Sequence, residues 1–266
     1  MRFYIWILAI ALLSACDSVF DTHPYDVNFK GETNINARNI AEIERRFADK
    51  DTLRVAFISD THLWHKDARD QVADLNQRTD IDFVIHGGDL TDTGTVREFQ
   101  WSHDIFSKLR YPYVALIGNH DFLGTGNQAF QTLYGKLDFS FIAGRVKFVC
   151  LNTNATEYDY LAAVPNFDFL EAEMDNSENR FDRSILVMHA PPFSDQFNNN
   201  VRKTFRRYLD YMPGLMFCAY GHNHTDLVSA LYDDDLLFYA IDCAAHRNYR
   251  IFTITPDGYE MEQVFY

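Results

Sequence analysis

The sequence has few cysteines, prolines and glycines and few basic residues for its length. With 4 Cys, 7 Pro and 12 Gly among 266 residues, it is neither a disulfide scaffold nor a collagen-like or low-complexity chain. Lys and Arg number 24 against 38 Asp and Glu, a net charge of −14. Because phosphate-backbone affinity comes mainly from clustered Lys and Arg, this balance disfavours nucleic-acid binding. The 47% of apolar residues can fill a large core, and ten histidines remain to be explained.

The first residues have the order typical of a bacterial secretion signal. Arg2 precedes an apolar run of eleven residues, 3–13, whereas a helix that crosses a bilayer core needs about 20. The run ends in Leu13-Ser14-Ala15-Cys16, which resembles the lipobox of bacterial lipoproteins. A buried N-terminal core helix is the alternative interpretation of the same run.

This leader predicts a chain that is anchored to a membrane by lipid. Residues 1–15 would be removed as a signal peptide, Cys16 would carry the lipid, and residues 16–34 would form a polar tether. The folded domain, residues 35–266, would then lie outside the cytoplasm in the cell envelope, on the periplasmic side or at the cell surface. Two kinds of acyl attachment at Cys16 would give stable anchoring, because one chain alone binds a bilayer only marginally.

Three further cysteines, Cys150, Cys218 and Cys243, lie in or beside apolar, strand-like runs. Three is an odd number, so at least one thiol stays free. We expect buried structural thiols, and the sequence leaves open a disulfide between Cys218 and Cys243.

From residue 50 onward, short apolar runs alternate with helical patterns. The apolar runs predict strands at residues 53–59, 83–86, 113–117, 146–151, 185–189 and 215–220. Periodicity predicts helices at residues 35–47, 67–78, 96–110, 128–133, 167–176 and 200–211. After Gly221, short strands follow one another at residues 227–232, 236–241, 249–255 and 259–264. Strands separated by helices favour βαβ units, so we expect one layered α/β domain with helices covering the sheet faces.

Five of these strands are each followed by a short polar cluster. Because ligands bind at the carboxyl ends of the strands in open α/β sheets, we expect the clusters to meet in one crevice. The side chains that could ligate a metal are Asp60, His62, Asp89, Asn119, His189, His222 and His224. Carboxylates, imidazoles and an amide without a thiolate suit Mn, Fe or Zn, and seven ligands are too many for one ion. Two ions that share one carboxylate would form a clamp for displacement at phosphorus.

The five clusters closely resemble the motifs of the calcineurin-like metallophosphoesterase superfamily. They read Asp-x-His, Gly-Asp-x-x-Asp, Gly-Asn-His-Asp, a lone His and Gly-His-x-His, in that order, between Asp60 and His224. The resemblance implies an α/β fold, a four-layer sandwich in which two mixed β-sheets are flanked by helices. It also implies two divalent metal ions, with Asp60, His62, Asp89 and His224 on one and Asp89, Asn119, His189 and His222 on the other. A bridging hydroxide would be the nucleophile, His120 the catalytic histidine, and Asp92 the carboxylate that orients it.

The chain departs from the motifs of several branches of the superfamily, which limits the branches it can belong to. Purple acid phosphatases place a tyrosine where this chain has Asp92, so a redox-active ferric site is disfavoured. Ala190 stands where the branch near cyclic-nucleotide phosphodiesterases commonly has a second histidine, which weakens that assignment. The arginines that could contact a substrate phosphate are Arg69, Arg202, Arg206, Arg207 and Arg247, although solvated helix faces explain the first four equally well.

The expected function is hydrolysis of a phosphomonoester or phosphodiester bond in a small substrate. A non-catalytic envelope lipoprotein that binds a phosphate ligand is one alternative, and the intact His120 and Asp92 argue against it. A nuclease is the other alternative, and the acidic charge argues against it. The sequence carries no signal for an oligomeric state.

Overall fold

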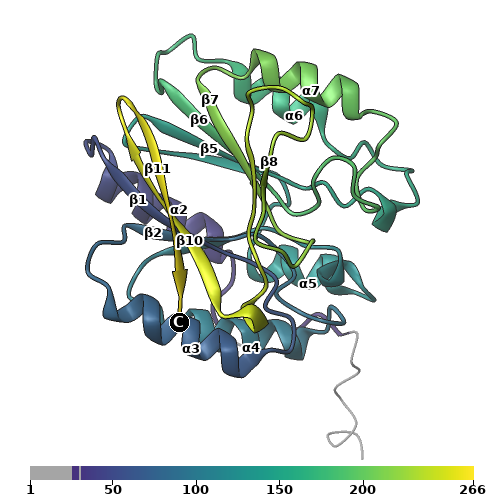
Figure 1. Ribbon diagram of the computed structural model, residues 1–266. Helices are drawn as coiled ribbons and strands as arrows, with labels where there is room; N and C mark the ends of the chain where they lie inside the picture. The colour runs from purple at the N-terminus through teal and green to yellow at the C-terminus, as the bar shows by residue number, and fades with distance from the viewer. Residues whose placement is uncertain (1–25, 30) are drawn as a thin grey trace, which may run out of the picture.

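The computed structural model describes residues 26–29 and 31–266, and two mixed β-sheets form its centre (Figure 1). The predicted signal peptide, Cys16 and the first part of the tether lie outside the described residues, and they stay predictions. None of the described helices is long and apolar enough to cross a membrane.

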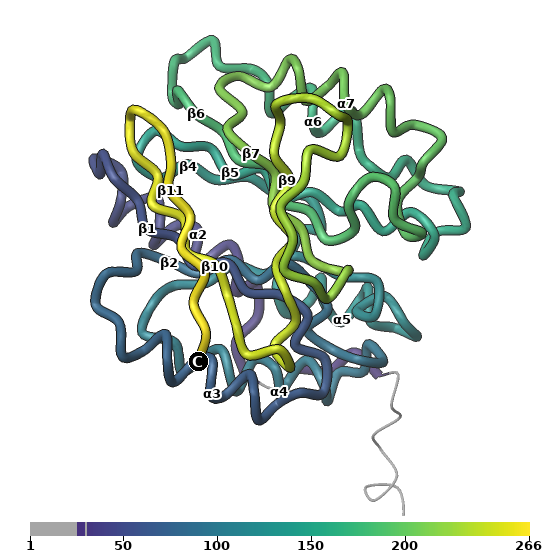
Figure 2. The backbone as a smooth tube through the Cα atoms, in the orientation of Figure 1, coloured from purple at the N-terminus to yellow at the C-terminus, as the bar shows by residue number. Residues whose placement is uncertain are grey.

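Five strands form the first sheet: β1 (Leu53–Ile58), β2 (Phe83–His86), β3 (Tyr113–Ala115), β10 (Asn248–Thr255) and β11 (Gly258–Phe265). Six form the second: β4 (Phe139–Ala143), β5 (Val146–Leu151), β6 (Arg183–Met188), β7 (Leu215–Tyr220), β8 (Val228–Ser229) and β9 (Phe238–Ala240). The strand orders are β11-β10-β1-β2-β3 and β4-β5-β6-β7-β9-β8. In the first sheet β1, β2 and β3 are parallel, with β3 at one edge, and β10 and β11 pair antiparallel at the other side. In the second sheet β5, β6, β7 and β9 are parallel, and β4 and β8 pair antiparallel at the two edges. Figure 2 shows the chain passing from β9 in the second sheet back to β10 in the first.

Helices cover the outer faces of both sheets. The first sheet packs against α3 (His65–Gln77), α4 (Val96–Phe106) and α5 (Gly126–Leu133), and the second against α6 (Phe167–Met174) and α7 (Arg202–Tyr211). In Figure 1, α3 and α4 lie below the two sheets, and α6 and α7 lie above them. This arrangement confirms the expected four-layer sandwich in which two mixed sheets are flanked by helices.

Aromatic side chains fill the space between the two sheets. Phe83 of the first sheet and Phe148 of the second meet edge to face, with ring centroids 5.3 Å apart. Phe217 and Phe252 stack across the same interface at 4.3 Å. All four side chains are buried. Such pairs contribute about 0.5–1.5 kcal/mol each beyond the burial of their area, so this layer holds the two sheets together.

The helix α2 (Ile35–Phe47) covers one edge of each sheet, at β3 and at β4. The side-chain amide of Asn36 donates to the carbonyl of Ala115 in β3 at 2.8 Å and accepts from its N–H at 2.9 Å. On β4, the N–H of Ile142 donates to Oε1 of Glu44 at 3.2 Å. Polar groups of α2 therefore satisfy backbone groups that an edge strand would otherwise expose to another chain.

Most predicted elements are found within a few residues of their expected ends, and two differ. The strand expected at 227–232 is reduced to β8, two residues long. The strand β4 was not predicted, and it pairs with β5 through a tight turn at Gly144 and Arg145, whose φ angles are 50° and 60°. The three cysteines beyond the leader are buried and free, so the Cys218–Cys243 disulfide is not formed.

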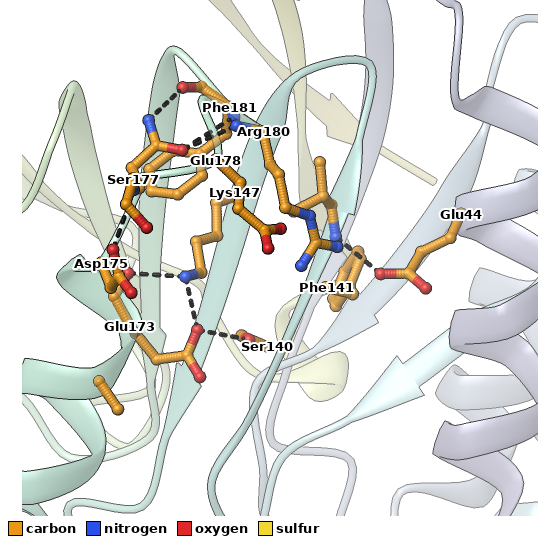
Figure 3. A pocket seen from close by; sticks show the side chains of 13 residues that line it. Glu44, Ser140, Phe141, Lys147, Glu173, Asp175, Ser177, Glu178, Arg180 and Phe181 are labelled. Atoms are coloured by element: carbon orange, nitrogen blue, oxygen red, sulfur yellow. Dashed lines mark hydrogen bonds and ion pairs between the residues drawn. The ribbon is translucent and has the colours of Figure 1, made fainter.

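A polar hollow lies at the amino ends of β5 and β6 (Figure 3). Within it, Nζ of Lys147 is 2.7 Å from Oε2 of Glu173, and Oγ of Ser140 donates to the same carboxylate oxygen at 2.6 Å. These groups satisfy one another. The hollow contains none of the predicted site residues, which follow the carboxyl ends of the strands.

His86 lies at the end of β2, and its imidazole is fully buried as a neutral ring. Its Nδ1 accepts from the N–H of Gly88 at 3.2 Å, and its Nε2 lies 3.2 Å from Oγ1 of Thr61. Burial lowers the pKa of His86 to about 3. Since nothing in this pocket compensates a positive charge fully, the folded protein keeps the ring neutral where the unfolded chain would protonate it.

We expect His86 to make stability pH-dependent. Its folded pKa lies below the unfolded value of about 6.5, so its contribution is complete above that pH and is lost as the pH falls toward 3. Between pH 6 and 4 the loss is about 1.4 kcal/mol in the free energy of unfolding per pH unit. The free energy of unfolding can be measured by urea denaturation in the presence of a chelator at several pH values in this range. Plotted against pH, it should have a slope that is shallower by about this amount in His86→Gln than in the wild type. Equal slopes in the two proteins would contradict the assignment.

Candidate metal centre

The loops after β1, β2, β3, β6 and β7 bring all seven predicted ligands together. Asp60 and His62 follow β1, Asp89 follows β2, Asn119 follows β3, His189 follows β6, and His222 and His224 follow β7. The side chains form two groups that share one carboxylate.

The first group consists of Asp60, His62, Asp89 and His224. Nε2 of His224 lies 3.2 Å from Oδ1 of Asp60 and 3.2 Å from Nε2 of His62. Nε2 of His62 lies 3.5 Å from Oδ2 of Asp89. One ligand atom from each of the four residues lies within 4.8 Å of all the others. This is the set that the resemblance assigns to one metal ion.

The second group is centred on Asn119. Its Oδ1 lies 3.0 Å from Nε2 of His189 and 3.0 Å from Nδ1 of His222. Nε2 of His189 also lies 3.3 Å from Oδ2 of Asp89. Oδ2 of Asp89 is therefore close to His62 of the first group and to His189 of the second. A carboxylate in this position can be shared by two neighbouring ions.

Backbone strain is concentrated in these ligands. Five of the seven have a left-handed backbone, with φ angles of 50° at Asp60, 41° at His62, 54° at Asp89, 68° at His222 and 48° at His224. This conformation is uncommon for a residue with a Cβ and costs of order 1–3 kcal/mol at each position. Strain of this kind persists where the surrounding structure enforces it, as it does at functional sites.

Two glycines allow the ligand loops to approach one another. A Cβ on Gly118 would lie 2.1 Å from Oδ1 of Asp89, and a Cβ on Gly221 would lie 2.6 Å from Oδ2 of Asp60. Both distances are far shorter than a van der Waals contact. Any larger residue at these positions would displace a carboxylate of the site.

Two carboxylates outside the seven hold the ligands in place. Asp121 is buried, and it accepts from the N–H groups of Leu90, Thr91 and Gly118, which fixes the loops beside Asp89. Oδ1 of Asp195 lies 3.0 Å from Nε2 of His222, the arrangement that orients a ligating imidazole. The sequence pointed to Asp121 as a supporting residue, because it is the last residue of the Gly-Asn-His-Asp motif. Asp195 lies in a loop without any readable pattern.

Charge pairing sets the protonation of the centre before a metal binds. Burial alone would lower the pKa of His189, but the carboxylates of Asp89 and Asp60 raise it to about 9. Burial favours the neutral form of Asp89, yet the neighbouring histidines prevail and lower its pKa. Burial and the charge of Asp89 together raise the pKa of Asp121 to about 7. A cation that binds His189 must therefore displace a proton from it.

His120 stands edge-on to His62, with ring centroids 4.6 Å apart, and its side chain is 39% exposed. Its Nδ1 donates to the backbone carbonyl of Asp92 at 2.8 Å, whereas Oδ1 of Asp92 is 4.0 Å away. That carboxylate oxygen is closer to Nδ1 of His62, at 3.5 Å. The ring of His120 is thus oriented by the carbonyl of Asp92, where the resemblance implied its carboxylate. The bond places the proton on Nδ1 and leaves Nε2 for other partners.

The start of α4 fixes the loop that carries Asp92. Thr95 and Glu98 form a capping box, in which each side chain bonds the other residue's N–H. The same Glu98 carboxylate accepts from the N–H and the hydroxyl of Thr93, each at 2.9 Å. The residue next to Asp92 is therefore tied to a helix end, which keeps the carbonyl partner of His120 in position.

The donor set fits two divalent cations. It offers carboxylate oxygens, imidazole nitrogens and one amide oxygen but no thiolate, and an Asp/His cluster of this kind is typical of dimetal phosphoesterases. Asp60, Asp89 and His189 are almost completely buried. Buried carboxylates need cationic compensation, which protonated His189 provides before a metal binds and which two metal ions would provide in its place.

Residues 53–226 match the family model described as calcineurin-like phosphoesterase. The match covers more than half of the chain and contains all seven ligands. The chain belongs to this family.

The chain shares only low sequence identity with individual members of known function or structure. It is 25% identical over 157 residues to a 3′,5′-cyclic-nucleotide phosphodiesterase of Nostoc sp. strain PCC 7120, over 56% of this chain and 58% of that protein. The chain thus spans little more than half the length of that relative. Among solved structures, GAP50, the anchor in the inner membrane complex of Plasmodium, is similar with a TM-score of 0.58 at 11% identity, over 81% of this chain and 85% of that one. The purple acid phosphatase PPD1 of yellow lupin (Lupinus luteus) has a TM-score of 0.52 at 14% identity, over 80% and 54%. Both structures share the fold.

Proposed function

We propose that the protein hydrolyses a phosphomonoester or phosphodiester bond with two divalent metal ions held by the seven ligands. The supporting observation is the position of Asp89, whose Oδ2 lies 3.5 Å from His62 and 3.3 Å from His189 and so joins the two ligand groups. When bound, the two cations would act as Lewis acids toward phosphoryl oxygens, and they would lower the pKa of a bound water molecule to a value near neutrality. The name of the Nostoc relative supports a diester as one of the bonds to test.

In this proposal His120 acts on the substrate beside the metals. Its backbone N–H donates to Oδ1 of Asp89 at 2.9 Å, so the residue is fixed relative to the shared carboxylate. Its imidazole is partly exposed and held in one orientation by the carbonyl of Asp92. Such a group can protonate a leaving alkoxide or stabilise charge on a phosphoryl oxygen. A module that only bound phosphate would not require this fixed, accessible imidazole.

The test is turnover of phosphoesters by the purified chain. With Mn²⁺ we expect hydrolysis of 4-nitrophenyl phosphate or bis(4-nitrophenyl) phosphate, measured by the absorbance of the released 4-nitrophenolate. The activity should be lost in EDTA. Binding of both esters without turnover in Mn²⁺, Fe²⁺ and Zn²⁺ would contradict hydrolysis and favour the non-catalytic alternative. Digestion of DNA or RNA by the tag-free protein would favour a nuclease instead.

A further inference from the structure

Large apolar side chains are exposed on the loops around the metal centre. Ten such side chains are exposed in the described part of the chain, and six of them stand on loops that follow β1, β3, β5, β6 and β7. These six, the apolar rim, are Leu63, Leu123, Tyr160, Leu161, Phe193 and Leu227, with exposed fractions from 43% to 90%. Leu63 is adjacent to a predicted ligand, and Leu123 donates its N–H to the carbonyl of His120. The rim therefore begins beside the ligands.

The loops that carry the apolar rim touch one another in a closed ring. Successive loops are joined by ring contacts or hydrogen bonds, and the last joins the first. In order, the contacts are Phe122 with Tyr158, Ala155 with Gln196, Asp195 with His222, Trp64 with His224, and His62 with His120. Since several of these contacts involve the ligands themselves, the loops that carry the six side chains surround the metal centre.

Phe193 is held rigidly although half of its side chain is exposed. Its φ angle is 74°, a strained value for a bulky residue. The N–H of Phe193 donates to Oδ1 of Asn199 at 2.8 Å, the Arg202 guanidinium lies 5.2 Å from the ring centroid, and the Tyr232 ring lies at 5.3 Å. Tyr160 is likewise half exposed with φ at 59°. Strained, fixed and exposed aromatic side chains are typical of a surface that binds a ligand.

Three of the five arginines expected to contact a substrate phosphate have partners within the protein. Of the arginines expected to contact substrate, Arg206 pairs with Asp234 and Asp210, and Arg247 pairs with Asp67 and Asp70. Arg202 covers Phe193. These three guanidinium groups are engaged within the protein, whereas the side chains of the apolar rim are exposed.

We propose that the apolar rim binds the alcohol portion of the substrate, which makes the substrate class phosphoesters of aliphatic, lipid-like alcohols. This inference rests on the proposed function. Four of the six rim side chains are leucines, which suit an aliphatic chain, whereas a nucleobase would need stacking combined with hydrogen-bond partners. In the reaction, the oxygen of water bonds to phosphorus, one P–O bond breaks, and the alcohol leaves with a proton.

Two homologous series of soluble, monomeric esters test the inference. One contains n-alkyl phosphates and the other n-alkyl 4-nitrophenyl phosphates, each from methyl to hexyl, assayed with Mn²⁺. We expect kcat/KM to rise about two- to fourfold for each added methylene, because each is partly or fully removed from water. In the double variant Leu161→Ser with Phe193→Ser, the hexyl-to-methyl ratio should fall at least tenfold, by the loss of roughly 50–100 Å² of apolar contact.

The matched control is Tyr211→Ser with Phe265→Ser, which removes apolar side chains that are 76% and 70% exposed on α7 and β11. The control should keep the wild-type ratio. Turnover of the methyl esters without any chain-length dependence would overturn the rim inference and leave the proposed function intact. The rim inference would also be overturned if the rim variant kept the steep dependence of kcat/KM on chain length, or if the control variant lost it too. If neither series is hydrolysed with Mn²⁺, Fe²⁺ or Zn²⁺, the proposed function fails and the rim inference fails with it.

Discussion

Replacing Asp89 with asparagine should lower kcat/KM for phosphoester hydrolysis by more than about 10³. The change keeps the shape of the side chain and removes its charge. Because Oδ2 of Asp89 lies near both His62 and His189, the loss affects both ligand groups at once. Removing this charge also withdraws the main partner that keeps His189 protonated before metal binding. We expect the metal content of Asp89→Asn, measured by mass spectrometry after dialysis, to fall below two ions per chain.

Asp82→Asn provides the matched control for a buried aspartate. Asp82 immediately precedes β2, at the opposite end of that strand from Asp89, and it accepts from the N–H of Arg54 and pairs with Lys50. This substitution should lower the free energy of unfolding and leave the metal content and the kcat/KM of the folded protein unchanged. An Asp89→Asn protein that binds two ions and turns over substrate at the wild-type rate would refute the shared-carboxylate arrangement.

The ligands could be predicted because each directly follows a strong strand signal. The run 215–220 is fully apolar, the runs 83–86 and 146–151 are apolar except for His86 and Lys147, and the structure has strands with the same bounds. Each ligand motif then occupies the few residues after a carboxyl end, where polar side chains gather in this class of fold. The left-handed backbone of His62 and His224 has no sequence signal, because only a few per cent of non-glycine residues adopt it, even though histidine does so more often than most.

The parts that the sequence did not predict depend on contacts between distant segments. β4 alternates buried and half-buried side chains over only five residues, and its turn places Arg145 at a φ that favours glycine, so its hairpin signal is weak. The carboxylate of Asp195 acquires its role only when its loop meets His222. The apolar rim is equally invisible in sequence, because single exposed leucines are common and only the ring of loops brings these together.

The motif correctly identified Asp92 as the partner of His120 but not the atom of Asp92 that makes the hydrogen bond. The resemblance indicated a carboxylate partner for His120, and the structure provides a backbone carbonyl from the same residue. The loop that presents the carbonyl is tied to the start of α4 through Thr93 and Glu98, whereas the carboxylate is 43% exposed and turns toward His62. We therefore regard the residue at position 92 as less important for orienting His120 than the loop conformation that presents its carbonyl.

His120→Ala should lower kcat by roughly 10²–10⁴ on alkyl phosphoesters, the range for loss of a general acid or base. The imidazole of His120 is 39% exposed, the backbone N–H of the residue donates to Asp89, and His120 is not one of the seven ligands that the resemblance assigns. Metal content should therefore stay at two ions per chain. His103→Ala is the matched control, because His103 lies in α4 and contacts the hydroxyl of Tyr113 at 3.1 Å, and this variant should keep the wild-type kcat.

The dependence on leaving group distinguishes the two roles that the geometry allows His120. If the imidazole protonates the leaving alkoxide, the variant should lose far less activity on 4-nitrophenyl esters, whose leaving group needs little protonation, than on alkyl esters. If it stabilises charge on a phosphoryl oxygen, the loss should be similar for both, about 10²–10³. We expect the first result, since Nδ1 is tied to the Asp92 carbonyl and Nε2 is the nitrogen left to exchange a proton with the substrate. Wild-type kcat on both ester types would exclude either role.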